Sequence, residues 1–260
     1  MPSPLDQWLE HAIAQDHGSL PHHTQTLKPV IENTIKPEDA AKQLVSDVTS
    51  NRDSADTAYR FWNLVFRTAA TFPPYFGVIV DLVLAIYDVP SGSEGFKGIE
   101  RYFWENWQDV YSDYYTYRTL ASSAGTNTPN NAKRWINFTH FSAILLHQSD
   151  KEVFVKEIGI HAFFDLRNAL KITVQTHGTK TLRHNSVVSA RQAMETDVVA
   201  AAQWVIYAGT KLLYLENAGF GNHWTRGLSQ KTELWDGEPG FSKARWEVWA
   251  RRFEESAKED

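Results

Sequence analysis

Apolar side chains recur at helical spacing through most of this chain, and that periodicity most constrains its fold. In the segment 34–50, the residues that return every three or four positions are Ala40, Ala41, Leu44, Val45 and Val48. This spacing places them on one side of an α-helix. Strict alternation of apolar and polar residues, the pattern of a half-buried strand, is almost missing. The sequence therefore predicts an all-α protein.

Glycine, proline and polar connectors divide this pattern into about eight helices. They are expected over residues 34–50, 54–72, 75–87, 99–121, 132–148, 152–172, 190–217 and 243–253. For 75–87, which is rich in Val and Ile, a strand is the alternative. Residues 176–187 are expected to form a polar loop, and Gly209 is interpreted as a point of close approach between helices.

The connectors between the expected helices are short to moderate, so we predict a single helical domain over 31–260. The polar stretch 122–131, which contains glycine and proline, is the candidate for an internal boundary. Residues 1–30 are expected to form an N-terminal segment that is partly extended or contains one short helix.

Ten Trp, ten Tyr and fourteen Phe residues predict an aromatic-rich core, because large rings bury much apolar area each. The chain has no cysteine, which excludes disulfides, thiolate nucleophiles and thiolate-bound zinc. Glycine-rich nucleotide-binding signatures and the Gly-x-Ser-x-Gly elbow of serine hydrolases are also missing from the sequence. We therefore expect no metal and no cofactor.

The chain carries a net charge of −5 and no long basic run, so nucleic acid is not an expected partner. Its first twenty residues lack the basic and apolar regions of a secretory signal. The apolar run 76–87 is too short to span a bilayer and contains Asp81. We expect an intracellular protein of the cytoplasm or nucleus that does not bind membranes.

Aromatic rings surround almost the whole circumference of the helix expected over 101–118. A surface helix carries its apolar residues on one face, so this pattern indicates either a central core helix or the wall of a ligand pocket. Trp104, Trp107 and Tyr111 are the candidate pocket residues.

Acidic residues recur on the same helix, where Glu105, Asp109 and Asp113 follow one another at intervals of four. This spacing places them on one face. Asp109 and Asp113 are candidates for ligand binding, for acid–base chemistry or for holding a hard cation. The alternative is a solvated charged face opposite a packed one.

His161 and Asp165 share a helix face at a spacing of four, with Arg167 close by. They are the remaining candidate ligand-binding residues, although a two-residue pairing is also common in purely structural roles.

The last expected helix begins after Ser242, which is placed to cap it. Phe241 precedes the cap and Trp246 is the fourth helical residue, which is the spacing of a hydrophobic staple. Trp246, Trp249 and Phe253 then lie on one face, whereas Arg245 and the other charged residues are expected to turn elsewhere. The pattern favours an aromatic face that fastens the helix to the core over one that grips a ligand.

Four segments together resemble a large family of fungal proteins of unknown function, DUF3632. These segments are "IKPEDAA" (35–41), "HAFFDLRNAL" (161–170), "AAAQWVIYAG" (200–209) and "LWDGEPGFSKARWEVWARRF" (234–253). One departure is Lys36-Pro37-Glu38, where the family often has Ser-Pro-Glu and hence a side-chain cap. The resemblance implies a mostly helical, intracellular fungal protein, and it implies no catalytic residues.

Two function hypotheses follow. The first is a non-enzymatic binding, scaffold or regulatory module with a protein partner. The second is a binding protein for a small apolar or aromatic molecule, or a cyclase or isomerase of fungal secondary metabolism, that uses an aromatic-lined pocket. Nucleic-acid binding through Arg245, Arg251 and Arg252 is weaker, because acidic residues alternate with them. The oligomeric state is not predicted.

Overall fold

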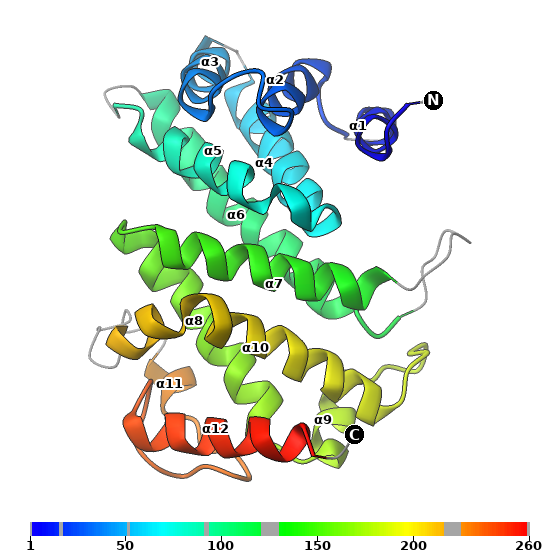
Figure 1. The fold of residues 1–260 in the computed structure, drawn as a ribbon, viewed down its shortest axis with the longest axis vertical. Helices are drawn as coiled ribbons and strands as arrows, with labels where there is room; N and C mark the ends of the chain where they lie inside the picture. The colour runs from blue at the N-terminus through cyan, green and yellow to red at the C-terminus, as the bar shows by residue number, and fades with distance from the viewer. Residues whose placement is uncertain are drawn as a thin grey trace. The chain divides into compact units, whose positions relative to one another are not determined.

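The computed structural model describes residues 2–15, 18–50, 53–90, 94–120, 130–215 and 225–258. Across these ranges it contains twelve α-helices, one short 3₁₀ helix and no strand, apart from two isolated bridges (Figure 1). This confirms the all-α prediction, although the helices outnumber the eight expected. The chain divides into an N-terminal unit, Met1–Asp113, and a C-terminal unit, Tyr114–Asp260. The candidate boundary at 122–131 lies outside the described residues, except for its last two positions.

Three α-helices of the N-terminal unit, and its 3₁₀ helix, begin at proline. Its elements are α1 (Pro4–Ala14), α2 (Pro21–Ile31), α3 (Pro37–Ser50), α4 (Ser54–Thr71), η1 (Pro73–Tyr75), α5 (Phe76–Asp88) and the first part of α6 (Glu94–Tyr117). Proline suits the first helical position because its missing N–H would have no partner there. The prolines after Thr71 end α4, as expected, and 75–87 is helical rather than extended.

Residues 1–30, expected to hold at most one short helix, contain α1 and nearly all of α2. Local capping explains α1: the Ser3 hydroxyl accepts a hydrogen bond from the Asp6 N–H at 3.1 Å, and the Asp6 carboxylate accepts one from the Ser3 N–H at 3.0 Å. Lys28 of α2 pairs with Asp6 at 2.6 Å. These contacts stabilise α1 and α2, whose weak apolar periodicity did not predict two helices in this segment.

The core of the N-terminal unit is aromatic, as the composition predicted. Trp62, Phe66 and Phe103 are fully buried and lie with ring centres 4.9 to 5.7 Å apart. The indole N–H of Trp62 donates to the Ile99 carbonyl at 2.9 Å, so this buried polar group is satisfied.

The C-terminal unit contains α7 (Asn130–Gln148), α8 (Glu152–Leu170), α9 (Val174–Thr181), α10 (Ala190–Tyr214), α11 (Thr225–Leu228) and α12 (Lys243–Ser256). The long helix α10 packs on α7, α8 and α9, and α12 packs on α8 (Figure 1). No single helix in the described part of the chain has the length and apolarity to cross a bilayer. The bent pair Ser54–Thr71 and Pro73–Asp88 meets that criterion on length and composition only.

The expected loop 176–187 is partly helical, because it begins inside α9. Thr173 caps α9 by accepting a hydrogen bond from the Thr176 N–H at 3.3 Å. A side chain at Gly178 would bring its Cβ within 2.5 Å of the Ala190 Cβ, so glycine permits α9 to approach the start of α10. The polar composition of α9 predicted a loop, but its contact with α10 stabilises it as a helix.

The C-terminal helix α12 confirms the predicted cap and staple. The Ser242 hydroxyl accepts a hydrogen bond from the Arg245 N–H at 3.2 Å, and Phe241 stacks on Trp246 at 5.9 Å. Trp249 is fully buried. The expectation that Arg245 turns away from the aromatic face is wrong, because its side chain is only 1% exposed.

Candidate functional site

The structure brings together the three aromatic candidates of α6. Trp107 is fully buried, stacks on Tyr111 at 5.1 Å and meets Trp104 edge-on at 6.2 Å. Trp104 and Tyr111 are only partly exposed. Their assignment to a ligand site stays a prediction, and their observed contacts are those of a packed ring cluster.

Asp109 and Asp113 of α6 each have a partner on α4, a helix of the same unit. Asp109 accepts a hydrogen bond from the Tyr59 hydroxyl at 2.8 Å, and Asp113 accepts one from Arg67 at 2.8 Å. Burial, followed by the hydrogen bond to Asp109, raises the pKa of Tyr59 to about 12. Because Tyr59 and Arg67 both lie in α4, these carboxylates bind α6 to α4. The described residues contain no group of three or more His, Asp or Glu side chains that could hold a metal ion.

His161 and Asp165 lie on α8, and Asp165 is directed to a different helix. Its buried carboxylate accepts a hydrogen bond from the Trp204 indole N–H of α10 at 2.8 Å. Burial lowers the pKa of His161 to about 4, so this side chain is neutral at pH 7.

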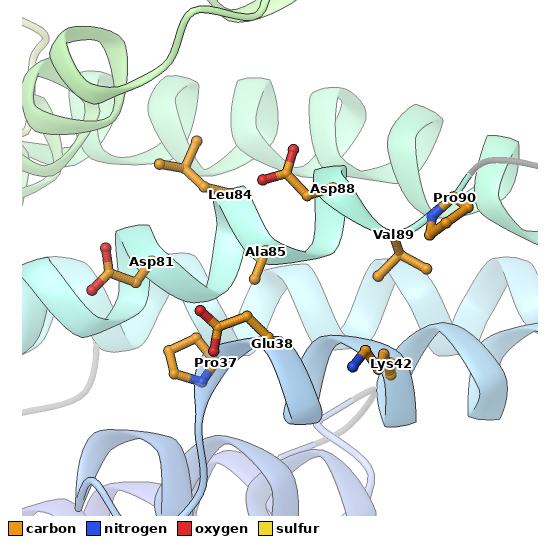
Figure 2. Close-up of a pocket in the computed structure, with 9 residues that line it drawn as sticks. All are labelled: Pro37, Glu38, Lys42, Asp81, Leu84, Ala85, Asp88, Val89 and Pro90. Carbon is orange, nitrogen blue, oxygen red and sulfur yellow. The ribbon is translucent and has the colours of Figure 1, made fainter.

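A surface hollow of about 540 Å³ lies between α3 and α5 and was not anticipated from the sequence (Figure 2). It is lined by Pro37, Glu38, Lys42, Asp81, Leu84, Ala85, Asp88, Val89 and Pro90. Burial, and then the negative charge of Glu38, raise the pKa of Asp81. All four charged lining residues are exposed to solvent, which is the ordinary condition of charged side chains.

The outward face of α10 is an exposed apolar surface. Val199, Ile206 and Leu213 follow one another at intervals of seven and are 45%, 65% and 49% exposed. Ala202 and Gly209 lie three positions after the first two of them. We call these five residues the α10 seam, because their spacing is that of positions a and d in a heptad.

Gly209 was expected to permit a close approach between helices of this chain. The space outside its Cα is open in the structure, since an added Cβ would meet only the Val205 side chain, at 3.8 Å. Glycine within a helix costs about 1 kcal/mol relative to alanine. No contact among the described residues explains that cost.

A second unusual feature is a pair of buried basic side chains surrounded by aromatic rings. Lys171, which follows the last residue of α8, is 0% exposed, and Arg245 of α12 is 1% exposed. The Lys171 Nζ atom lies 4.6 Å from the Trp235 ring centre and 4.9 Å from that of Trp249. The Arg245 guanidinium carbon lies 4.8 Å from the Phe163 ring centre and 5.0 Å from that of Trp235. We call this arrangement the cation cage.

The cation cage was not predicted from the sequence, although two signals for it were present. Arg245 stands four residues before Trp249, so both occupy one helix face. The placement of Lys171 gave a weaker signal, as a single charge between Leu170 and Ile172. Trp235 offered none, because a loop rather than a helix positions it.

The chain is thus an all-helical protein with an exposed apolar seam and a buried cation cage in its C-terminal unit. Residues 62–253 match the model of a family described as "Protein of unknown function (DUF3632)", and the chain belongs to that family. Neither a curated protein nor a solved structure matches it.

The family match extends over three of the four segments that carry the resemblance, and segment 35–41 precedes it. Two of these three segments meet at the cation cage: 161–170 supplies Phe163, and 234–253 supplies Trp235, Arg245 and Trp249. The third, 200–209, contains the centre of the α10 seam.

Proposed function

We propose that this protein is a non-enzymatic binding and scaffold module in which the α10 seam of one copy docks against that of a second copy. The observation that carries the proposal is the exposure of Val199, Ile206 and Leu213 at heptad spacing. Soluble proteins rarely leave a continuous apolar stripe in water unless it is a binding surface.

The α10 seam fits an identical antiparallel helix. If Ile206 lies on the twofold axis, equal intervals of seven place Val199 of one copy opposite Leu213 of the other. Ala202 and Gly209 are small enough to let two helix backbones approach closely, which explains why a glycine is tolerated inside α10.

Charge also favours a second copy over an unlike partner. Lys211 is the only charged residue between Val199 and Tyr214. Its ammonium group pairs with Asp150 at 3.2 Å instead of pointing at the seam. An uncharged, self-complementary seam meets no like-charge repulsion from its own copy, whereas unlike helices usually select one another through flanking charges.

The first test is the mass of the protein in solution, measured by light scattering over a range of concentrations. We expect a dimer that Ile206→Glu converts to a monomer, because each copy would then bury a carboxylate at the twofold axis. Val187→Glu is the matched control, since Val187 lies outside α10 and is also 65% exposed. A wild-type monomer at about 100 μM, far above the Kd of a stable dimer, would refute the proposal, and so would a dimer that persists in Ile206→Glu.

A second test uses the absence of cysteine from the chain. Ile206→Cys should form an intermolecular disulfide rapidly under mild oxidation, because the two residues face each other across the axis. Val199→Cys should not, since the two copies of residue 199 would be about 20 Å apart, at 1.5 Å per residue over fourteen residues. Rapid cross-linking of Val199→Cys would instead indicate a parallel pairing and contradict the antiparallel geometry.

A further inference from the structure

Lys171 and Arg245 are two buried basic side chains whose hydrogen-bonding capacity is largely unused. Among the described residues, the Lys171 Nζ has no hydrogen-bond partner, and neither do Nε and Nη1 of Arg245. The remaining Arg245 nitrogen, Nη2, donates to the Glu238 carbonyl at 3.0 Å. A buried cation without hydrogen bonds is costly, and a contact with aromatic rings returns only about 0.5 to 2 kcal/mol.

The charged groups around Lys171 are themselves mostly cations. Arg245 lies on α12 and Arg167 on α8, and both lower the pKa of Lys171, after the larger effect of burial, to about 6. The acidic residues of the loop before α12, Glu233, Asp236 and Glu238, are exposed. The Glu233 carboxylate accepts hydrogen bonds from the Thr173 N–H and from the Thr176 hydroxyl of α9. Glu238 contributes its backbone carbonyl, and its residue is exposed.

We propose that Lys171 and Arg245 form a binding site for an oxyanion, the carboxylate or phosphate group of a small molecule. Such a group accepts hydrogen bonds from several N–H donors at once, and guanidinium is well shaped to supply two of them. It would supply the negative charge that the described surroundings of these two side chains lack. Trp235 and Trp249 would then contact the part of the ligand that carries the anion.

A ligand would have to enter through the loop that carries Trp235, because Lys171 and Arg245 are themselves buried. Residues 233, 234 and 236–239 of this loop are exposed, and Trp235 itself is partly exposed. Its backbone contacts include the Leu234 N–H to the Lys171 carbonyl at 3.2 Å and the Gly240 N–H to the Leu228 carbonyl at 3.3 Å. Gly237 lets the indole lie against the turn, because a Cβ there would come within 2.6 Å of the ring. Displacement of one tryptophan would therefore open the cage without unfolding a helix.

The proposal is tested by calorimetric titration of the full chain with sodium phosphate and, separately, with sodium benzoate at pH 8. Sodium chloride at equal ionic strength serves as the reference. We expect at least one of the two anions to bind. Because Lys171 would change from neutral to charged, binding should take up about one proton, which is measured by comparing buffers of different ionisation enthalpy. Binding of phosphate alone, or of benzoate alone, would identify which of the two oxyanions the site accepts.

Two variants test whether the anion binds at Lys171. Lys171→Met, which preserves volume, should abolish the proton uptake and weaken binding roughly tenfold or more, as expected for loss of a hydrogen bond to a charged group. Lys231→Met removes an exposed lysine from the same loop region and should bind like the wild type. Failure of both anions to bind at about 10 mM, a concentration that still detects Kd values in the millimolar range, would overturn the proposal. Undiminished binding by Lys171→Met would overturn it as well.

Discussion

The guanidinium of Arg118 donates two hydrogen bonds to the carboxylate of Asp197, from Nε to Oδ1 at 2.5 Å and from Nη2 to Oδ2 at 2.7 Å. His177 approaches the same carboxylate at 2.8 Å from Nε2 to Oδ2. All three side chains are buried. This cluster joins the residue that follows α6 to α9 and α10 within the C-terminal unit.

Asp197→Asn should lower the free energy of unfolding by about 3 to 5 kcal/mol, because it leaves the buried Arg118 without its counter-charge. Urea unfolding at pH 7 measures this loss. Asp150→Asn is the control: it removes the exposed partner of Lys211 and should cost no more than about 1 kcal/mol. Equal losses in the free energy of unfolding would mean that the buried ion pair stabilises the protein no more than the exposed one does.

The same cluster should destabilise the protein in acid. Burial raises the pKa of Asp197, but the hydrogen bond from His177 and the charge of Arg118 outweigh it, and the net pKa is lowered. The folded carboxylate therefore holds its proton less tightly than the unfolded one. Its contribution to stability is present above about pH 4, the pKa of an unfolded aspartate, and is lost as the pH falls through the folded pKa. Acid unfolding monitored by circular dichroism should accordingly begin at a higher pH for His177→Phe than for the wild type.

Lys171→Met should stabilise the anion-free protein. Replacing a buried, unpaired amine by an apolar side chain of similar volume should raise the free energy of unfolding by about 1 to 4 kcal/mol at neutral pH. Between the folded pKa of about 6 and the unfolded value near 10.4, the unfolded wild type binds the extra proton, so wild-type stability rises with pH. The advantage of the variant should thus be greatest near pH 6 and shrink towards pH 10, as measured by urea unfolding at both values. A variant less stable than the wild type would show that the amine forms a favourable contact.

His23 of α2 should make the stability of the N-terminal unit depend on pH. Burial, followed by the charges of His22 and Arg60, lowers its pKa from 6.5 to about 3. The folded side chain is neutral while the unfolded one becomes charged, so stability is lost as the pH falls from 6.5 towards 3. His23→Leu should flatten the decline in Tm over this interval. Urea unfolding at pH 8, where both forms of the wild type are neutral, separates this effect from any packing cost of the substitution.

Gly178→Ala and Gly209→Ala should have opposite effects on stability. The first forces a Cβ to within 2.5 Å of the Ala190 Cβ and should destabilise by about 1 to 3 kcal/mol. The second adds a methyl group to open space on α10 and should stabilise the monomer by about 0.5 to 1 kcal/mol. Urea unfolding at low protein concentration compares the two variants, and a loss of stability in Gly209→Ala would contradict the open surface described for α10.

Trp249→Ala should cost stability before it costs any binding activity. Trp249 is fully buried, and its ring meets those of Phe163, Phe241 and Trp246 at 5.0 to 6.2 Å. Truncation of a buried tryptophan costs about 3 to 5 kcal/mol, which thermal or urea unfolding would report. Leu234→Ala, at a side chain that is 39% exposed, should cost far less. Normal stability of Trp249→Ala with lost binding would show that this ring serves the site rather than the fold.

Sequence reasoning succeeded where the relevant contacts are local. The cap at Ser242, the staple of Phe241 on Trp246 and the stop at Pro73-Pro74 all depend on residues a few positions apart. It was less successful for α1, α2 and α9, where caps and packing hold helices of weak periodicity. The acidic residues of α6 were read correctly as sharing a face, but their partners Tyr59 and Arg67, some fifty residues away, could not be known.

The sequence by itself determined the all-helical class, the aromatic core, the family and the fastening of the last helix. Helical periodicity and capping depend on neighbours within about one turn, so they can be recognised from the sequence alone. Only the tertiary structure decided that Arg245 turns inward, that Trp235 covers Lys171 and that Gly209 faces open space. Burial of a charge depends on which distant segments surround it, and no local pattern encodes that.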